Sequence, residues 1–204
     1  MKKLSVQPED TAARTGTVVV ISGPSGCGKT TVCNRLATED PRIALSVSAT
    51  TRPPRPGERD GVEYRFLSES DFRDRIARGE FAEYAEYNGR LYGTPRRPLE
   101  EKLAEGRTVL VEIDVQGAGQ LRQVYPRALY IFLDTPNSDV ARKRLEHRNT
   151  ETPEERRRRL ETAERERVMA EQVRFDCRVI NDDLDETVAK VRNLIAGKTG
   201  RTTV

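Results

Sequence analysis

The feature that most constrains this chain is a glycine-rich segment, residues 18–31, with the sequence Val-Val-Val-Ile-Ser-Gly-Pro-Ser-Gly-Cys-Gly-Lys-Thr-Thr. Gly23, Gly28, Lys29 and Thr30 match the spacing G-x-x-x-x-G-K-[ST], and the apolar run before them predicts a buried strand. Backbone N–H groups converge on phosphate oxygens in such a loop, which requires glycine where the chain approaches its ligand closely. The segment is therefore predicted to bind a nucleoside triphosphate. A glycine-rich turn with a chance Lys-Thr pair is the alternative.

Individual residues of this loop are expected to hold phosphate in different ways. Lys29 would reach the outer phosphates as a positive charge, and the Thr30 hydroxyl would ligate the Mg²⁺ that bridges them. Cys27 lies near Lys29 and a helix start, where the pKa of a thiol tends to fall, so it is either an oxidisable position or a small filler. The predicted ATP-binding set is Gly23, Pro24, Ser25, Gly26, Cys27, Gly28, Lys29, Thr30 and Thr31.

Length and cysteine content limit the class of protein. The 204 residues suit one α/β domain with insertions, because a core of that size needs no disulfide or metal to be stable. No apolar run approaches the roughly eighteen residues of a membrane span, and residues 1–15 lack the apolar stretch of a secretory signal. The three cysteines are odd in number and form no C-x-x-C pair, which fits a reducing compartment. We expect a cytoplasmic protein without a membrane partner.

Charge is nearly balanced along the chain. The 36 Lys and Arg residues against 33 Asp and Glu give a net charge of +3, which is too even for a dedicated nucleic-acid binder. The basic excess collects at residues 52–59, at 156–159 and from Lys198 onward. Nucleic-acid binding would rest on the last two clusters, with a salt-dependent DNA shift as its signature. No nucleic-acid partner is expected.

Apolar runs and turn residues predict the order of the core elements. Buried parallel strands, covered by helices on both faces, are expected at residues 17–21, 108–113, 128–133 and 177–180. Helices are expected at residues 29–37, 138–148, 152–172 and 185–195. Little of the charged stretch 142–167 has the pattern of a buried surface. Residues 1–15 are predicted to be a flexible leader, and residues 197–204 a flexible basic tail.

Residues 45–94 have a different character, with short strand-like pieces in place of long apolar runs. Strands are expected at residues 45–48, 63–67 and 81–87, with Pro-Pro and Pro-Gly turns between them. Ser68 is expected to cap a helix that ends at Gly79, and a further helix should run from Thr94-Pro95 to Glu105. This pattern predicts a small inserted subdomain.

Residues 46–64 carry the first of three polar clusters beyond the loop. Arg52 and Arg55 lie on a proline-stiffened segment, so they lose little rotational freedom when they bind a phosphate. Neighbouring hydroxyls favour the same interpretation: Ser46, Ser48, Thr50 and Thr51. A second anion site is predicted, and a solvated basic loop is the alternative.

The run from Phe81 to Thr94 is the second cluster. Strand alternation puts Glu83 on the face opposite Ala82 and Tyr84, and Tyr92-Gly93-Thr94 ends in a hydroxyl. Taken alone, the run is more typical of an ordinary exposed strand than of a binding site.

The third cluster is Val111-Glu-Ile-Asp-Val-Gln-Gly117. An acidic residue at the end of an apolar strand is the usual second partner of Mg²⁺ in a chain with a phosphate-binding loop. Asp114 is favoured for this role beside Thr30. Glu112, two residues earlier on the same face, would instead point toward a second substrate.

Together these stretches resemble the guanylate kinase family, among the P-loop nucleoside monophosphate kinases. The resemblance covers about 16–195 and rests on six motifs in that family's order: Gly-Pro-Ser-Gly-x-Gly-Lys, Ser-Val-Ser-x-Thr-Thr-Arg-x-Pro-Arg-x-Gly-Glu-x-x-Gly-x-x-Tyr, Phe-x-Glu, Tyr-Gly-Thr, Ile-Asp-x-Gln-Gly and Val-Ile-Asn-Asp. Other nucleoside monophosphate kinases do not share the stretch 45–94.

The resemblance implies an α/β fold of the P-loop NTPase type, with three layers, a central parallel sheet, a small mixed α/β GMP-binding insert and a helical lid. It implies a core of residues 16–44, 106–137 and 168–196, an insert of 45–94 and a lid of 138–167. The implied reaction is reversible, Mg²⁺-dependent transfer of the ATP γ-phosphoryl group to GMP in purine nucleotide metabolism. ATP and GMP, with dGMP as a further candidate, are the implied partners of a monomer or homodimer.

The resemblance also implies roles for individual residues. The GMP-binding set would be Ser48, Arg52, Arg55, Tyr64, Glu83, Tyr92, Thr94 and Glu112. Guanine offers two donors on one edge, so the Glu83 carboxylate can accept from both, whereas adenine would present a lone pair to it. The catalytic set would be Lys29, Arg52, Arg144, Arg148 and Arg159, although solvated helix charges remain the alternative for the last three. Asn181-Asp182-Asp183 is the candidate adenine region.

Departures from the family pattern are small, and two rival functions remain. Asn149 stands where the family usually has Gly, and Glu112 where many members have Asp. A scaffold domain that binds peptides would generally carry a degraded phosphate loop, whereas this loop is intact. In a related ribose-bisphosphate kinase, Ser48, Glu83 and the Tyr92-Gly93-Thr94 motif would have no purpose.

Overall fold

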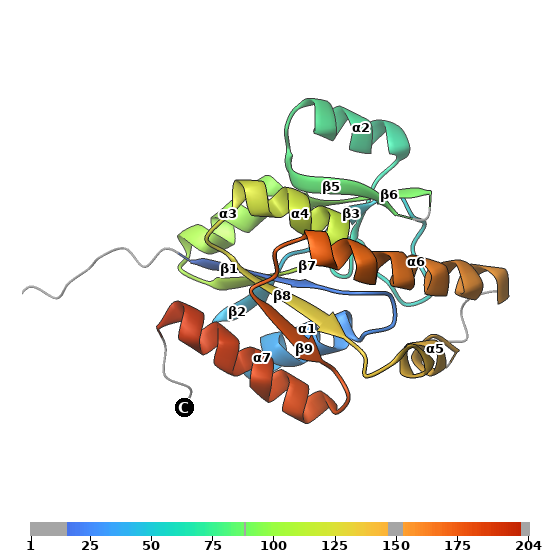
Figure 1. The fold of residues 1–204 in the computed structure, drawn as a ribbon. Coiled ribbons are helices and arrows are strands. Elements are labelled where there is room, and N and C mark those ends of the chain that lie inside the picture. The colour runs from blue at the N-terminus through green and yellow to red at the C-terminus, as the bar shows by residue number, and fades with distance from the viewer. Residues whose placement is uncertain (1–15, 88, 147–152, 201–204) are drawn as a thin grey trace, which may run out of the picture.

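A five-stranded parallel sheet forms the middle layer of this computed structural model, which describes residues 16–87, 89–146 and 153–200. In the order β2-β7-β1-β8-β9, its strands are Ile43–Leu45, Thr108–Glu112, Thr17–Ser22, Leu129–Asp134 and Cys177–Ile180 (Figure 1). All neighbouring pairs are parallel, and the three central strands are almost wholly buried. The continuous apolar runs of the sequence therefore form a parallel sheet, as predicted.

Helices cover both faces of this sheet (Figure 1). One face carries α1 and α7, Lys29–Glu39 and Leu184–Thr199, and the other carries α3, α4 and α6, Arg96–Ala104, Val115–Val124 and Pro153–Gln172. Alternate residues of β1 pack into two different hydrophobic clusters, one on each face of the sheet. Val19 and Ile21 belong to the cluster that includes α1 and α7 residues. Val18 and Val20 belong to the cluster with α3 and α4 residues. The result is a three-layer α/β fold.

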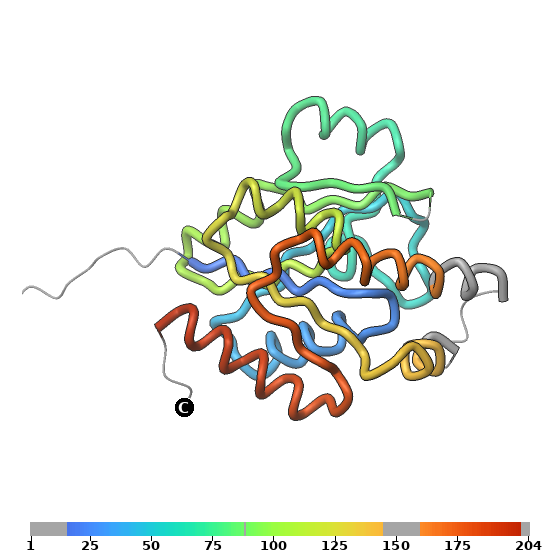
Figure 2. The backbone as a smooth tube through the Cα atoms, viewed as in Figure 1, coloured from blue at the N-terminus to red at the C-terminus, as the bar shows by residue number. Residues whose placement is uncertain are grey.

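The segment between β2 and α3 builds a second, smaller sheet above the first (Figure 2). Its order is β4-β3-β6-β5, formed by Arg65–Phe66, Ala49–Thr50, Arg90–Pro95 and Phe81–Tyr87. The helix α2, Glu69–Ala77, begins after Ser68, whose hydroxyl accepts a hydrogen bond from the Asp71 N–H as a capping residue should. Phe72 and Phe81 stack with ring centroids 4.4 Å apart, and this pair forms the centre of the insert's own small core.

Several boundaries differ from the sequence-based expectation. Of the strand expected at 45–48, only Leu45 lies in a strand, at the end of β2, and residues 46–48 connect β2 to β3. The strand expected at 63–67 shortens to β4. The strand β6 was not predicted, and it takes Thr94 and Pro95 from the expected start of α3. The helix α4 was also not predicted, because two glycines in ten residues are unfavourable for a helix.

The carboxyl-terminal part of the chain is more ordered and more buried than predicted. α7 continues through Gly197 to Thr199, so the predicted tail 197–204 is wrong in its first three residues. Ala163 and Glu166 of α6 are buried, at 1% and 7% exposure, within a stretch expected to be solvated. α5, Ser138–Glu146, begins where predicted. The leader 1–15, Arg148 and Asn149 lie outside the described residues.

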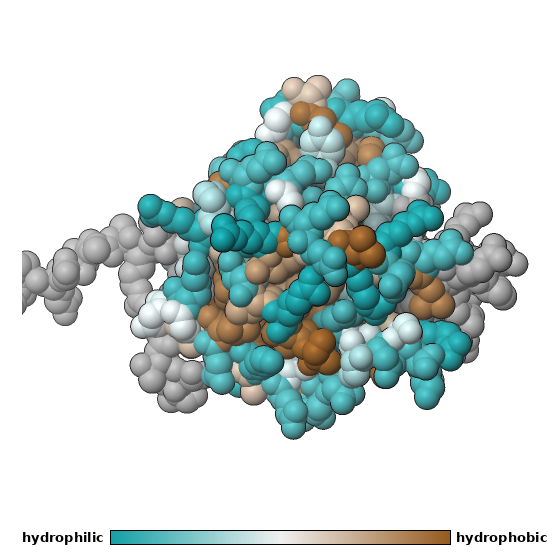
Figure 3. All heavy atoms as spheres, in the orientation of Figure 1, coloured by the Kyte–Doolittle hydropathy of each residue, from teal (hydrophilic) through white to brown (hydrophobic). Residues whose placement is uncertain are grey.

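The surface agrees with the charged composition. The face drawn in Figure 3 is mainly hydrophilic, with hydrophobic side chains in small groups between charged ones. The most exposed large hydrophobic residues are Val62, Val168 and Ile180. Among the described residues, no helix has both the length and the apolar character needed to cross a membrane.

Candidate active site

A cavity of about 1280 Å³ lies where the main sheet meets the insert. The phosphate-binding loop, the end of β7 and the insert all contribute to its lining. From the residues predicted to bind ligands, it is lined by Ser25, Gly26, Gly28, Lys29, Thr30, Thr31, Ser48, Arg52, Arg55, Tyr64, Glu83, Tyr92, Glu112 and Asp114. The fold thus brings together side chains from three distant parts of the sequence.

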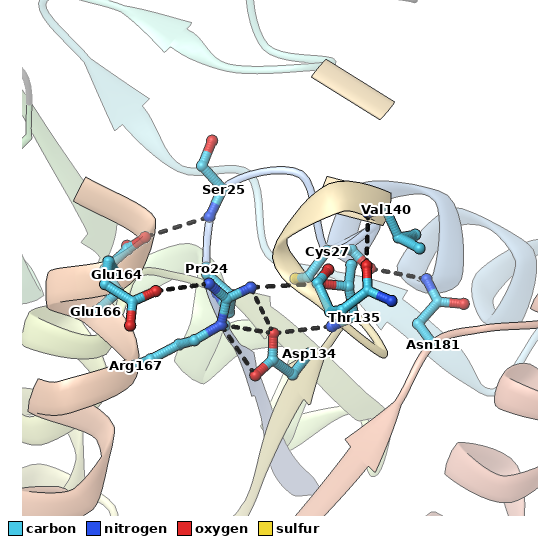
Figure 4. Close-up of polar contacts among 12 residues, drawn as sticks. Pro24, Ser25, Cys27, Asp134, Thr135, Val140, Glu164, Glu166, Arg167 and Asn181 are labelled. Carbon is cyan, nitrogen blue, oxygen red and sulfur yellow. Dashed lines mark hydrogen bonds and ion pairs between the residues drawn. The ribbon is translucent and has the colours of Figure 1, made fainter. Parts of the chain in front are cut away.

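The phosphate-binding loop connects β1 to α1 and has the backbone that its glycines predict. Gly23, Gly26 and Gly28 all have positive φ angles, a region that favours glycine. A Cβ atom on Gly28 would overlap the Asn181 side chain, which donates from Nδ2 to the Cys27 carbonyl at 2.8 Å (Figure 4). Asn181 follows β9, so the last strand of the sheet helps to hold the loop.

Lys29 bends back over its own loop. Its Nζ donates to the Gly23 carbonyl oxygen at 2.5 Å and to the Pro24 carbonyl at 3.3 Å. Burial opposes the charge, but the pKa of Lys29 is raised overall because Cys27, Glu166 and Glu112 surround it. The ammonium is therefore charged at neutral pH and available to phosphate oxygens.

Cys27 is buried beneath the loop rather than exposed on it. Burial raises the pKa of its thiol, in spite of the nearby Lys29 ammonium. A neutral, inaccessible thiol is poorly reactive, which favours the interpretation of Cys27 as a small filler.

Two residues of α6 that the sequence-based reasoning missed contact the loop and the end of β8, respectively (Figure 4). The Glu166 Oε2 atom accepts a hydrogen bond from the Ser25 backbone N–H at 3.2 Å. Arg167 donates from Nε to both carboxylate oxygens of Asp134, at 3.1 and 3.2 Å, where β8 ends. The spacing of buried Ala163, Glu166 and Ala170 is the i, i+3, i+7 pattern of a packed helix face, a signal that the charge of this stretch concealed.

Thr30 meets Glu112 rather than Asp114. The Thr30 hydroxyl donates to Glu112 Oε1 at 2.7 Å, so these two oxygens lie together at the end of β7. Asp114 is the capping residue of α4, and its Oδ1 accepts a hydrogen bond from the Gly117 N–H at 2.7 Å. Burial raises the pKa of Asp114. The Thr30 hydroxyl therefore contacts Glu112, whereas the Asp114 carboxylate caps α4.

The two insert arginines are organised by a glutamate that was not singled out from the sequence. Arg52 donates to Glu58 Oε1 at 2.8 Å, and the Arg55 backbone N–H donates to Glu58 Oε2 at 2.7 Å. The Arg52 guanidinium also lies 5.3 Å from the centroid of the Tyr64 ring, which in turn packs edge-on against Tyr92. Burial raises the pKa of Tyr64 to about 12, so its hydroxyl remains a donor.

Two hydroxyls expected at the anion site form hydrogen bonds with backbone groups of the insert instead. Thr50 Oγ1 donates to the Leu91 carbonyl at 3.0 Å, and Thr51 Oγ1 accepts from the Leu91 N–H at 2.9 Å. Both bonds join β3 and its following turn to β6. Ser46 and Ser48 remain on the wall of the cavity.

Glu83 is buried, at 4% exposure, and lines this cavity. A β-bulge between Phe81 and Glu83 interrupts the alternation of β5 and pairs Glu83 with Thr94 of β6. The Thr94 hydroxyl donates to Glu83 Oε1 at 2.6 Å. Burial, reinforced by the charge of Asp114, raises the pKa of Glu83 to about 7. The interpretation as an ordinary exposed strand is therefore wrong at Glu83, whereas Tyr84 is indeed exposed.

A second cavity of about 490 Å³ lies on the other side of the loop. Its lining includes Gly28, Arg144 of α5, and Asn181 and Asp182 after β9. Arg144 donates from Nη2 to the Asp182 carbonyl at 3.2 Å. Among the described residues, Arg144 Nη1 and the Asn181 Oδ1 atom are buried without a hydrogen-bond partner, as in a site built for a polar ligand. Of the remaining expected arginines, Arg148 and the Arg159 side chain lie outside what the structure describes.

Comparisons with known proteins match this chain to one family. The guanylate kinase family model matches residues 15–198. The chain is 46% identical over 187 residues to a guanylate kinase of Symbiobacterium thermophilum, covering 92% of this chain and 88% of the relative. A guanylate kinase of Rubrobacter xylanophilus is 45% identical over 90% of this chain and 97% of its own length. A crystal structure of guanylate kinase from Anaplasma phagocytophilum superposes with a TM-score of 0.76 at 32% identity, covering 93% of this chain and 89% of that one.

Proposed function

This chain belongs to the guanylate kinase family, and on that premise we propose how its residues carry out the transfer of a phosphoryl group from ATP to GMP. The proposal rests on one observation, namely which groups line the larger cavity. The phosphate-binding loop, Arg52 and the buried Glu83 all line this one cavity, and the Thr94 hydroxyl donates to Glu83. A nucleoside triphosphate and a nucleoside monophosphate can therefore meet through their phosphates.

ATP is assigned to the loop and the second cavity. Its phosphates would lie on the backbone N–H groups of the loop, with Lys29 beside the outer ones. The adenine would enter the second cavity, where Arg144 and Asn181 hold buried polar atoms without partners among the described residues. The loop set predicted from the sequence stays as proposed, except that Cys27 contributes only its backbone.

GMP is assigned to the insert. Its phosphate would be bound by Arg52 and Arg55, with Tyr64 and Tyr92 as hydroxyl donors. Its guanine would donate from N1–H and the 2-amino group to Glu83, whose position Thr94 fixes. Ser48 lies on the same wall of the cavity. Asp114 lies close to Glu83, so we assign it to the surroundings of the guanine and not to the Mg²⁺ site that the sequence suggested.

The residues that fit a Mg²⁺ ion are Thr30 and Glu112. A hydroxyl and a carboxylate, already in contact at the mouth of the loop, supply the hard oxygen donors that Mg²⁺ prefers. When bound there, Mg²⁺ would neutralise charge on the phosphates of the nucleotide. We therefore assign to Glu112 the role that the sequence suggested for Asp114.

The reaction needs no side-chain nucleophile. A phosphate oxygen of GMP forms the new bond to the γ-phosphorus of ATP, while the bond from that phosphorus to the bridging oxygen breaks and ADP leaves. Lys29 and Arg52, which line the larger cavity, would stabilise the charge that develops on the transferred group, and they would hold both nucleotides in line. Arg144 lines the second cavity, so a catalytic role for it rests on the resemblance. Arg148 and Arg159 stay assigned to the same role from the resemblance alone.

We propose the same three parts that the sequence suggested, with one changed boundary. The core is 16–44, 106–137 and 168–196, and the GMP-binding insert is 45–94. Glu166 and Arg167 contact the loop and β8, so the carboxyl-terminal end of the proposed lid, 138–167, belongs with the core. Closure of the rest of the lid over the bound nucleotides would exclude water, which would otherwise accept the phosphoryl group.

The test is ADP release in a coupled assay with ATP, Mg²⁺ and each of GMP, AMP, CMP and UMP. We expect GMP alone to support rapid turnover, and Glu83→Gln to raise KM for GMP. Glu86→Gln, an exposed carboxylate on the same strand, is the matched control. Comparable turnover of another monophosphate, or equal effects of the two substitutions, would contradict the assignment of Glu83.

A further inference from the structure

The first turn of α4 lies against the Glu83 carboxylate at a glycine. A Cβ atom built on Gly117 would be 2.6 Å from Glu83 Oε2 and 3.3 Å from its Cδ. It would also be 3.4 Å from Asp114 Oδ1. The Glu83 carboxylate is therefore held between two elements, with Oε1 bonded to Thr94 of β6 and Oε2 against the backbone of α4.

Backbone conformation does not explain a glycine at this position. Gly117 lies inside α4 and is not among the glycines with positive φ. A glycine within a helix is unfavourable compared with alanine, because it loses more conformational freedom on folding. The presence of glycine here therefore points to a steric requirement: a larger residue would collide with Glu83 Oε2.

The same helix contains a glycine without that requirement. A Cβ atom on Gly119 would meet only the Val173 Cγ2 atom, at 3.6 Å, which is an ordinary van der Waals distance. Both residues are in α4, two positions apart. They form a matched pair in which only one substitution reaches Glu83.

We propose that Gly117 is a positioning residue for guanine recognition, because its missing side chain leaves room for the Glu83 carboxylate between β6 and α4. This inference rests on the proposed role of Glu83. A methyl group at residue 117 would press on the end of a side chain and not on backbone. The carboxylate would move, either losing the Thr94 hydroxyl or shifting into the space of the base, while the fold around it remains.

The experiment compares Gly117→Ala with Gly119→Ala, measuring KM for GMP, kcat and the affinity for ADP. We expect Gly117→Ala to raise KM for GMP by about ten- to a hundredfold, since a displacement of about 1 Å has effects of that size. ADP affinity should not change, because the loop is untouched. Gly119→Ala should match the wild type in all three quantities. Equal KM values for the two variants would overturn the proposal.

A double-mutant cycle separates positioning from a general packing defect. Glu83→Ala removes the carboxylate that the added methyl would meet, so Gly117→Ala should cause no further rise in KM on that background. The same applies to folding: should Gly117→Ala lower the thermal midpoint, Glu83→Ala should restore it. Additive effects in the cycle would contradict the inference. If Glu83→Gln itself leaves GMP use unchanged, the proposed role of Glu83 has failed, and not the steric relation.

Discussion

The proposed phosphate end and the proposed base end of the larger cavity are built in different ways. At the phosphate end, the groups suited to anions already contact oxygens of the protein: Lys29 contacts the Gly23 carbonyl, the Ser25 N–H contacts Glu166, and Arg52 contacts Glu58. At the base end, Glu83 is buried and contacts the Thr94 hydroxyl and the backbone near Gly117. At the phosphate end, positive groups thus contact protein oxygens that a phosphate oxygen can replace. At the base end, packing fixes the position of the Glu83 carboxylate.

This difference follows from the two kinds of recognition. Attraction between charges decreases slowly with distance, so a phosphate can replace a carbonyl or carboxylate oxygen even when the groups move. Recognition of a base by two hydrogen bonds depends on distance and angle, so its carboxylate must be in place beforehand. Four predictions test this contrast, in order of decreasing effect.

Removal of the Lys29 charge should have the largest effect. Lys29→Met leaves the transferred phosphoryl group without its nearest positive side chain, so kcat should fall by about 10²- to 10³-fold. Steady-state kinetics with saturating ATP and GMP would measure it. Lys190→Met, an exposed lysine on α7, is the charge-matched control and should retain wild-type kcat. Similar losses in both variants would show that general charge, and not the loop lysine, is responsible.

Removal of the Arg52 guanidinium should weaken GMP binding. Arg52→Met should raise KM for GMP by about ten- to a hundredfold, since hydrogen bonds to charged groups contribute that much to affinity. KM for ATP should change little. Arg59→Met removes an exposed arginine from the same segment and should leave KM for GMP unchanged. A larger effect on ATP than on GMP would refute the assignment of Arg52 to the second substrate.

The pH dependence of GMP affinity should reveal Glu83. Burial raises its pKa to about 7, and guanine requires the charged carboxylate, so each pH unit below 7 should lower GMP affinity by up to about tenfold. The affinity should level off above pH 7, where the carboxylate is already charged. Titration calorimetry between pH 5.5 and 8 would measure this. In Glu83→Gln, the remaining pH dependence of GMP affinity comes from the GMP phosphate alone. Identical pH profiles for the wild type and this variant would contradict the assignment of Glu83 to guanine.

Neutralisation of Glu166 should have the smallest effect and the opposite sign. Its carboxylate contacts the Ser25 N–H and lies near Lys29, so it competes with phosphate for the same positive region. Glu166→Gln should tighten ADP binding by about threefold, because the desolvated like charge is removed. Glu171→Gln, exposed on the same helix, controls for net charge. Weaker ADP binding in Glu166→Gln would instead assign Glu166 a supporting role in the loop.

Local signals predicted much of the fold. The loop motif, the apolar runs of the main sheet, the Ser68 cap and the starts of α5 and α6 are each contained in a few neighbouring residues, so they can be recognised from the sequence. The helix α4 could not be recognised in this way, because it contains two glycines, which disfavour a helix. One of them, Gly117, lies against Glu83 of β5, a contact outside the helix itself. Similarly, the bulge in β5 depends on its pairing with β6, and no pattern within β5 indicates it.

The sequence by itself determined the family, the phosphate-binding loop and many of the side chains that line the cavity. The tertiary structure decided which of them meet. Thr30 contacts Glu112 across 82 positions, and Ser25 contacts Glu166 across 141, so neither contact leaves a local pattern. The reason is geometric, because the parallel register of β1 and β7 and the packing of α6 bring these residues together. A linear motif specifies the groups, whereas contact between them requires the folded sheet.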